Sequence, residues 1–222
     1  MRTLQLVEVI SRISFEDATA RKIKEMLKVS SELLYWFTVS NGENQAMAFE
    51  ELEFFVGAID EGIDSHLMLE AIFKDNDGLM KLCPKFLIAD LVKKISENGR
   101  FAEYLVLLSN VTCAGEKNIL EKQFEVIRCL AAPETSKKVL QFFCSTSTPD
   151  YQKKSKLMAP LVNKKGLKET DLPRDLAYHL ELVKVVTGCT VGRINITSVE
   201  AKVQSLWNFV DVVNAILDNN SP

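Results

Sequence analysis

The chain has 222 residues, of which 47% are hydrophobic, and its formal net charge is −3. A chain of this size can bury a core without disulfides or metal, as one large domain or two small ones. The near-neutral charge excludes a global basic field for nucleic acid, and only 9 glycines and 6 prolines argue against an all-β fold with many turns.

Apolar residues recur at helical spacing, with turn and cap signals between the periodic segments. No segment predicts a strand. The regular succession of amphipathic helices predicts an all-α fold, an armadillo/HEAT-like α-solenoid. We expect about eleven helices, over residues 4–13, 16–39, 46–59, 65–74, 84–98, 101–108, 120–127, 133–144, 151–162, 171–192 and 197–217.

The pattern also predicts which residues face inward and where helices begin. In residues 16–39 the inward set is Ile23, Met26, Leu27, Leu34 and Phe37. In residues 84–98 it is Leu87, Ile88, Leu91, Val92 and Ile95, between Pro84 and an Asn98-Gly99 stop. Helix starts are predicted at Asp171, with Pro173 in the first turn, at Asn118 with Glu121, and at a capping box of Thr197 and Glu200.

The five cysteines form no C-x-x-C pair, and most of them lie in apolar helical patterns: Cys83, Cys113, Cys129, Cys144 and Cys189. Their odd number and positions favour reduced, buried thiols in a cytosolic protein. No apolar run approaches the ~20 residues of a membrane-spanning helix.

Motifs for chemistry are weak. His66 and His179 have no second ligand at metal spacing, and both are interpreted as packing or surface residues. The DNDG stretch at residues 75–78 would place Phe73 and Pro84 at calcium-ligand positions, so it is interpreted as a polar helix stop. No phosphate-loop or nucleophile-elbow motif occurs. We expect no enzyme, no metal and no cofactor.

Charge is unevenly distributed. Residues 43–77 hold ten acids and one lysine, and residues 136–168 hold eight lysines and one acid. Both can be solvated faces, or they can be docking surfaces for two different partners. The basic stretch contains no arginine, which argues against a built phosphate site and against nucleic acid. The candidate interaction residues are Glu50, Glu51, Glu53, Lys153, Lys154, Lys156, Lys164 and Lys165.

Four stretches resemble a known family when taken in order. They are IFKDNDGLM, ENGRFAEYLVLL followed by a glycine turn and a helix with Gln123, LAYHLELVKVVTGCTVGR, and QSLWNFVDVV. This succession, over about residues 33–213, resembles the RIH domain (ryanodine and inositol-trisphosphate receptor homology). The sequence departs from the family pattern at Asn208, where a proline often stands.

The resemblance implies a non-catalytic segment of the cytosolic solenoid of a calcium-release channel, on the cytosolic face of the endoplasmic reticulum. Residues 32–218 would be the RIH-type domain and residues 1–31 leading helices. Its partners would be other channel domains or subunits, or partner proteins. The family's inositol-phosphate site lies in another, arginine-containing region, so no direct ligand binding is expected.

Two rival hypotheses remain open. One is a free-standing RIH-type adaptor or assembly scaffold, distinguishable by whether the natural reading frame continues into apolar helices. The other is an enzyme or phosphate-binding module. It predicts that changing Lys153, Lys154 and Lys156 together abolishes an activity without changing stability.

Overall fold

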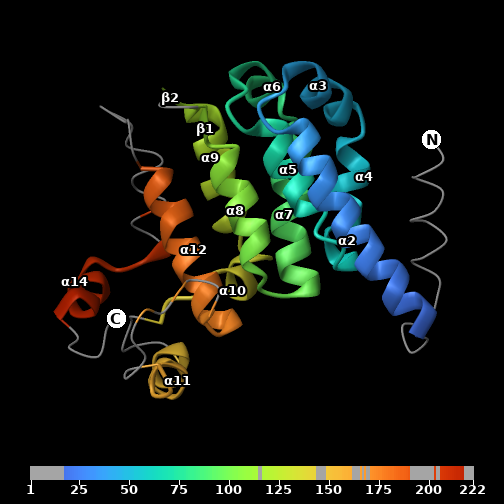
Figure 1. Ribbon diagram of the computed structural model, residues 1–222. Helices are drawn as coiled ribbons and strands as arrows, with labels where there is room; N and C mark the ends of the chain where they lie inside the picture. Colours follow the sequence, from blue (N-terminus) through green and yellow to red (C-terminus); the bar gives the residue numbers. More distant parts are fainter. Residues whose placement is uncertain are drawn as a thin grey trace. The chain divides into compact units, whose positions relative to one another are not determined.

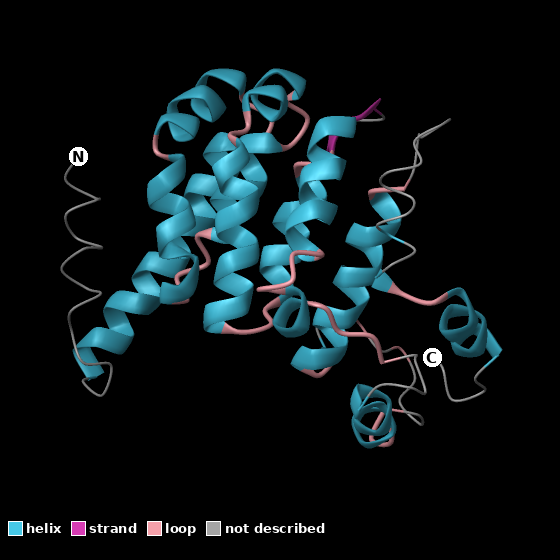
Figure 2. Ribbon diagram, turned by 180° about the vertical axis from the view of Figure 1, so that it is seen from behind, coloured by secondary structure: helices cyan, strands magenta, loops and turns pink. Residues whose placement is uncertain are grey.

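The chain forms two compact units, Met1–Cys83 and Pro84–Pro222 (Figure 1). The computed structural model describes residues 18–114, 117–143, 149–161, 166, 168, 171–190, 203 and 206–217. Apart from one hairpin, every described element is a helix, which confirms the predicted all-α class (Figure 2). In the hairpin, β1 (Cys113–Ala114) pairs antiparallel with β2 (Lys117–Asn118).

The first unit is built around a short apolar helix, α5 (His66–Phe73). Its buried side chains are Met68, Leu69, Ala71, Ile72 and Phe73. Helices that pack against it are α2 (Ala18–Thr38), α3 (Gly42–Glu50), α4 (Leu52–Gly57) and α6 (Asp77–Leu82), and a 3-10 turn, η1 (Ala58–Glu61), follows α4. A helix that is apolar on most of its surface lies inside, as α5 does.

The second unit is a series of helices in which α7 packs on α8, α9 and α10, and α8 packs on α12. Their bounds are α7 (Lys85–Asn98), α8 (Ala102–Asn110), α9 (Leu120–Leu130), α10 (Ser136–Val139), α11 (Pro149–Met158), α12 (Arg174–Gly188) and α14 (Phe209–Leu217). Such side-by-side succession is the arrangement of an α-solenoid, as predicted.

The prediction for α7 is confirmed in detail. Pro84 is its N-cap, all five predicted inward residues are buried, and the helix ends at Asn98 with Gly99 as C-cap. Three of the predicted buried thiols, Cys83, Cys129 and Cys189, are buried and form no disulfide.

The residues predicted to face inward on α2 are not the ones that the structure buries. Met26, Leu34 and Phe37 are exposed, while Ile23 and Leu27 are half-buried. The fully buried residues of α2 are instead small or polar: Ala20, Ser31 and Thr38. Helical periodicity locates the most apolar side of a helix, but it does not determine which side meets the neighbouring helices.

Two predicted helices are interrupted. The segment 46–59 breaks at Glu51, whose φ of −101° and ψ of 20° separate α3 from α4. The segment 197–217 breaks at residues 207–208, although Leu206 is helical. Asn208 then starts α14, because its side chain accepts a hydrogen bond from Val210 N at 2.9 Å.

The remaining corrections concern helix starts and lengths. Pro173, not Asp171, is the N-cap of α12. Ile119, not Asn118, is the N-cap of α9, because Asn118 pairs in the hairpin. The helix predicted over 133–144 is only α10, whose N-cap is Thr135. The helix predicted to run to Gly192 ends earlier, because α12 stops at Gly188 with Cys189 as its C-cap. The helix predicted over 4–13 and the Thr197–Glu200 box lie outside the described residues.

Candidate functional site

A buried glutamine connects α3 to the end of α5. The Gln45 side chain, only 2% exposed, donates from Nε2 to the carbonyls of Ala71 at 2.9 Å and Lys74 at 2.8 Å. Its Oε1 accepts from Asn76 Nδ2 at 2.9 Å. The last carbonyls of a helix lack partners within the helix. Gln45 therefore satisfies the end of α5 and fixes α3 against it.

The DNDG stretch is a helix stop followed by a helix start. Asp75 adopts a left-handed conformation with φ 55°, and α6 begins where Asn76 Oδ1 accepts from Leu79 N at 3.0 Å. This geometry confirms the interpretation as a polar stop. Asn76 also contacts Gln45, so the turn belongs to the same connection.

In the second unit, the turn between α7 and α8 connects two further helices. Arg100 Nε donates to the carbonyl of Lys138 at 2.8 Å, at α10, and the carbonyl of Arg100 accepts from Arg174 Nε at 2.9 Å, at α12. Arg174 lies over the Phe101 ring, with Cζ 3.7 Å from its centroid. One turn therefore links four helices.

Gly99 makes this turn possible for two reasons. Its φ is +114°, where only glycine is unstrained. A Cβ at this position would also lie 2.6 Å from Arg174 Nη2. The glycine therefore supplies both the backbone path and the space for the arginine.

A second buried glutamine, Gln123 on α9, donates to the carbonyl of Gly188 at 2.9 Å, at the last residue of α12. As at Gln45, a long amide side chain donates to a carbonyl at a helix end, which has no partner within its own helix. Each unit therefore contains a buried glutamine that hydrogen-bonds to the end of a helix.

Tyr178 and His179 join α12 to the segment after α10. The Tyr178 hydroxyl donates to the carbonyl of Val139 at 2.5 Å, and burial raises the pKa of this phenol. His179 Nδ1 lies 3.2 Å from the carbonyl of Gln141, and its ring lies 5.2 Å from that of Phe143. Burial lowers the pKa of His179, so the neutral imidazole is favoured. These are the surroundings of a packing histidine.

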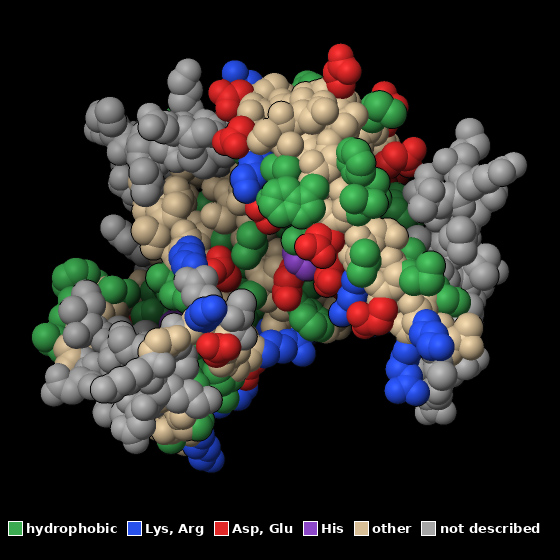
Figure 3. All heavy atoms as spheres, viewed as in Figure 1, with side chains coloured by type: hydrophobic (Ala, Val, Ile, Leu, Met, Phe, Trp, Pro, Cys, Tyr) green, Lys and Arg blue, Asp and Glu red, His purple; other side chains and the backbone are tan. Residues whose placement is uncertain are grey.

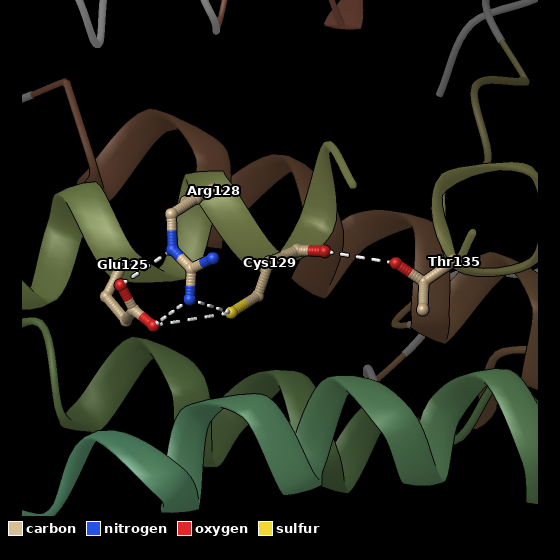
Figure 4. A network of polar contacts seen from close by, with 4 residues as sticks. All are labelled: Glu125, Arg128, Cys129 and Thr135. Atoms are coloured by element: carbon tan, nitrogen blue, oxygen red, sulfur yellow. Dashed lines mark hydrogen bonds and ion pairs between the residues drawn. The ribbon is translucent and has the colours of Figure 1, made fainter. Parts of the chain in front are cut away.

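A polar network closes the C-terminal end of α9 (Figure 4). Arg128 Nε donates to Glu125 Oε2 at 2.9 Å, and this hydrogen bond lowers the pKa of Glu125. The Cys129 Sγ lies 3.7 Å from Glu125 Oε1, while Thr135 Oγ1 donates to the Cys129 carbonyl at 3.1 Å. Burial, followed by the Glu125 charge, raises the pKa of Cys129. The thiol is therefore protonated at neutral pH and is not an activated nucleophile.

The predicted acidic residues Glu50, Glu51 and Glu53 are all exposed at the junction of α3 and α4. Figure 3 shows carboxylate side chains gathered at the end of the first unit where α3 lies. All three side chains are accessible to solvent, and an acidic interaction surface at these positions stays a prediction.

The predicted basic residues do not form an equivalent surface in the described part of the chain. Lys153 forms an ion pair with Asp175. Lys154 is only 4% exposed, with Nζ 5.9 Å from the centroid of the Tyr151 ring, and Lys156 is exposed. The other two, Lys164 and Lys165, lie outside the described residues. A basic interaction surface at these positions stays a prediction.

Two absences hold for the described residues. The described residues include no cluster of three or more His, Cys, Asp or Glu side chains that could hold a metal ion. None of the described helices combines the length and hydropathy needed to cross a bilayer.

The comparison with known proteins decides the family. The sequence pattern of the RIH domain matches residues 3–145. The chain belongs to the RIH domain family. It is also similar to the inositol 1,4,5-trisphosphate receptor itr-1 of Caenorhabditis elegans, with 27% identity over 221 residues that make up 97% of this chain. The chain spans 8% of the length of that receptor.

Some of the connecting side chains lie in the stretches that resemble the RIH family. ENGRF contains the turn with Gly99 and Arg100, DNDG contains Asn76, and the α9 glutamine is Gln123. These three side chains lie within the stretches that resemble the family, whereas Gln45 and Arg174 lie outside them.

Sequence reasoning missed Gln45, Arg100 and Arg174 as connecting residues. Their acceptors lie 26 residues away for Gln45, 38 for Arg100 and 74 for Arg174. A glutamine in an amphipathic segment or an arginine beside a glycine turn has no local signature of such a role. Only the position of Gln45 on the packed side of α3 distinguishes it.

Proposed function

We propose that this chain is a non-catalytic scaffold segment of the cytosolic solenoid of an inositol-trisphosphate/ryanodine-type calcium-release channel. It transmits small displacements between neighbouring parts of the channel and makes protein contacts. Membership of the RIH family and similarity to an inositol trisphosphate receptor support this proposal. The single observation that carries it is the set of side-chain connections between helix ends.

These connections suit a mechanical role. A helix held only by apolar packing can slide by small amounts, whereas a helix end that receives a directed hydrogen bond must move with its partner. Gln123 couples α9 to α12, and Arg174 couples α12 to the turn before α8. A displacement applied to α12 is therefore passed to α8 and α9.

The test uses a full-length channel that contains this segment. Gln123→Ala removes the donor to Gly188, and Gln152→Ala changes an exposed glutamine on α11. We expect Gln123→Ala to reduce inositol-trisphosphate-evoked calcium release while ligand affinity and channel abundance are unchanged. The Gln152→Ala control should behave as wild type.

Unchanged release in Gln123→Ala channels, at normal abundance, would contradict the relay. A natural reading frame that lacks membrane-spanning helices would instead favour the free-standing adaptor.

A further inference from the structure

Helix α2 carries its largest apolar side chains on the side that faces away from its own unit. Met26, Val29, Leu33 and Trp36 follow one another at spacings of three and four residues, which places them on one side of the helix. All four are exposed, Met26 by 69% and Trp36 by 68%. A row of this kind usually marks a contact surface, because monomers rarely expose contiguous apolar patches.

The row continues onto α3. Phe37, at the end of α2, is 61% exposed, and Met47 on α3 is 69% exposed. The two helices are held together there, because Asn44 Nδ2 donates to the Phe37 carbonyl at 2.7 Å. We name Met26, Val29, Leu33, Trp36, Phe37 and Met47 the α2–α3 surface. In Figure 3, hydrophobic side chains gather along α2.

Carboxylates border this surface along most of its length, while Arg21 and Lys22 lie at its N-terminal end. On α2, Glu25 and Glu32 precede Val29 and Trp36 by four residues each, so they run along one edge of the row. On α3, Glu43 and Glu50 lie four residues before and three after Met47, on the same exposed side. All four acids are exposed.

From this arrangement we propose that the α2–α3 surface is a docking site for an amphipathic helix of a partner protein, with a basic flank. The row from Met26 to Phe37 covers roughly 16 Å, about three helical turns. A partner helix would pack apolar residues at i, i+3, i+4 and i+7 on this row and direct lysine or arginine at the bordering acids. Methionine and tryptophan suit such a surface, since one adapts its shape and the other buries a large area.

The bordering charge disfavours other occupants. An anionic membrane surface would be repelled by Glu25, Glu32, Glu43 and Glu50. A second copy of the chain, packed through the same surface, would oppose like charges. A helix with a basic flank can pack apolar side chains on the row and also place positive charge beside the bordering carboxylates.

The experiment titrates the full chain with a synthetic leucine/lysine amphipathic helix and follows tryptophan emission. Trp36 is exposed, so we expect free chain to emit at long wavelength from this residue and to shift to shorter wavelength on binding. The shift should be absent in a Trp36→Phe variant. A leucine/glutamate helix of the same apolar pattern is the matched control probe, and it should bind at least ~10-fold more weakly.

Charge-reversal variants locate the site. Glu43→Lys combined with Glu50→Lys should weaken binding of the leucine/lysine helix by about 10-fold or more. Glu121→Lys combined with Glu134→Lys makes the same charge change at two exposed acids of the second unit and should leave affinity within about two-fold. Equal weakening by both pairs, or by neither, would overturn the proposal.

Three further outcomes would also overturn it. A Trp36 signal that is already short-wavelength in the free chain would mean that the surface is covered from within the chain. A concentration-dependent shift without peptide, lost in Phe37→Glu, would mean that a second copy covers it. Binding to phosphatidylserine vesicles with the same Trp36 shift would mean a membrane surface instead.

Discussion

Gly99 shows how a single residue controls a junction between helices. Its positive φ strains any other residue, and a Cβ there would lie 2.6 Å from Arg174 Nη2, so the arginine would have to move. We expect Gly99→Ala to lower the free energy of unfolding by about 1–3 kcal/mol, because the alanine is strained and displaces the arginine. Urea denaturation measures this change.

The matched control is Gly57→Ala in α4. No atom lies within 4 Å of a Cβ built on Gly57, and its φ is −60°. Alanine there should be neutral or stabilising by up to ~1 kcal/mol. Equal effects of the two substitutions would show that the Gly99 geometry does not matter.

His179 predicts a pH dependence of stability. Burial lowers its pKa below the ordinary value of 6.5, and Lys154 acts in the same direction. As pH falls through 6.5, the unfolded chain binds a proton that the folded chain still excludes, so stability decreases with acidification in this window. His179→Asn, which retains a donor for the Gln141 carbonyl, should reduce this slope in urea denaturation measured between pH 7 and pH 5.

A Gln152→Asn variant, at an exposed position without a titratable side chain, should retain the wild-type slope. If His179→Asn left the slope unchanged, the titration of another group would have to account for it.

At the level of helices, we expect the hydrogen bonds that join helix ends to contribute substantially to the free energy of unfolding. Gln45→Ala leaves the carbonyls of Ala71 and Lys74 without their buried donor. We expect a loss of about 2–4 kcal/mol in the free energy of unfolding, with faster amide hydrogen exchange in α5 and α6. Exposed Gln152→Ala should change stability by less than ~0.5 kcal/mol. A similar small effect of Gln45→Ala would contradict a structural role for the connection.

Helix positions were predictable where local signals and packing agree. In α7 the proline start, the glycine stop and one apolar stripe all indicate the same helix, and the structure follows them. In the segment 46–59 the apolar residues keep helical spacing across the break at Glu51. A one-residue interruption changes this spacing very little, so the periodicity does not reveal it. Asn208 marks the start of α14, because its side chain accepts a hydrogen bond from Val210 N.

At the scale of the whole molecule, we expect no direct binding of inositol phosphate. Residues 136–168 contain no arginine, Lys153 pairs with Asp175, and Lys154 is buried. A phosphate cluster needs several accessible cations in fixed geometry. Isothermal titration of the chain with inositol trisphosphate should give no saturable heat. A dissociation constant in the micromolar range or tighter would contradict this expectation.

The all-α class, most helix positions and the family could be predicted from the amino-acid sequence, because helical periodicity and caps are local and the family pattern lies in consecutive stretches. Tertiary structure alone decided that Gln45 and Arg174 join helix ends, and that Met26, Trp36 and Phe37 face outward. The physical reason is that the hydrogen-bond partners and the exposed side of a helix both depend on which helices pack against it. These neighbouring helices come from distant parts of the chain.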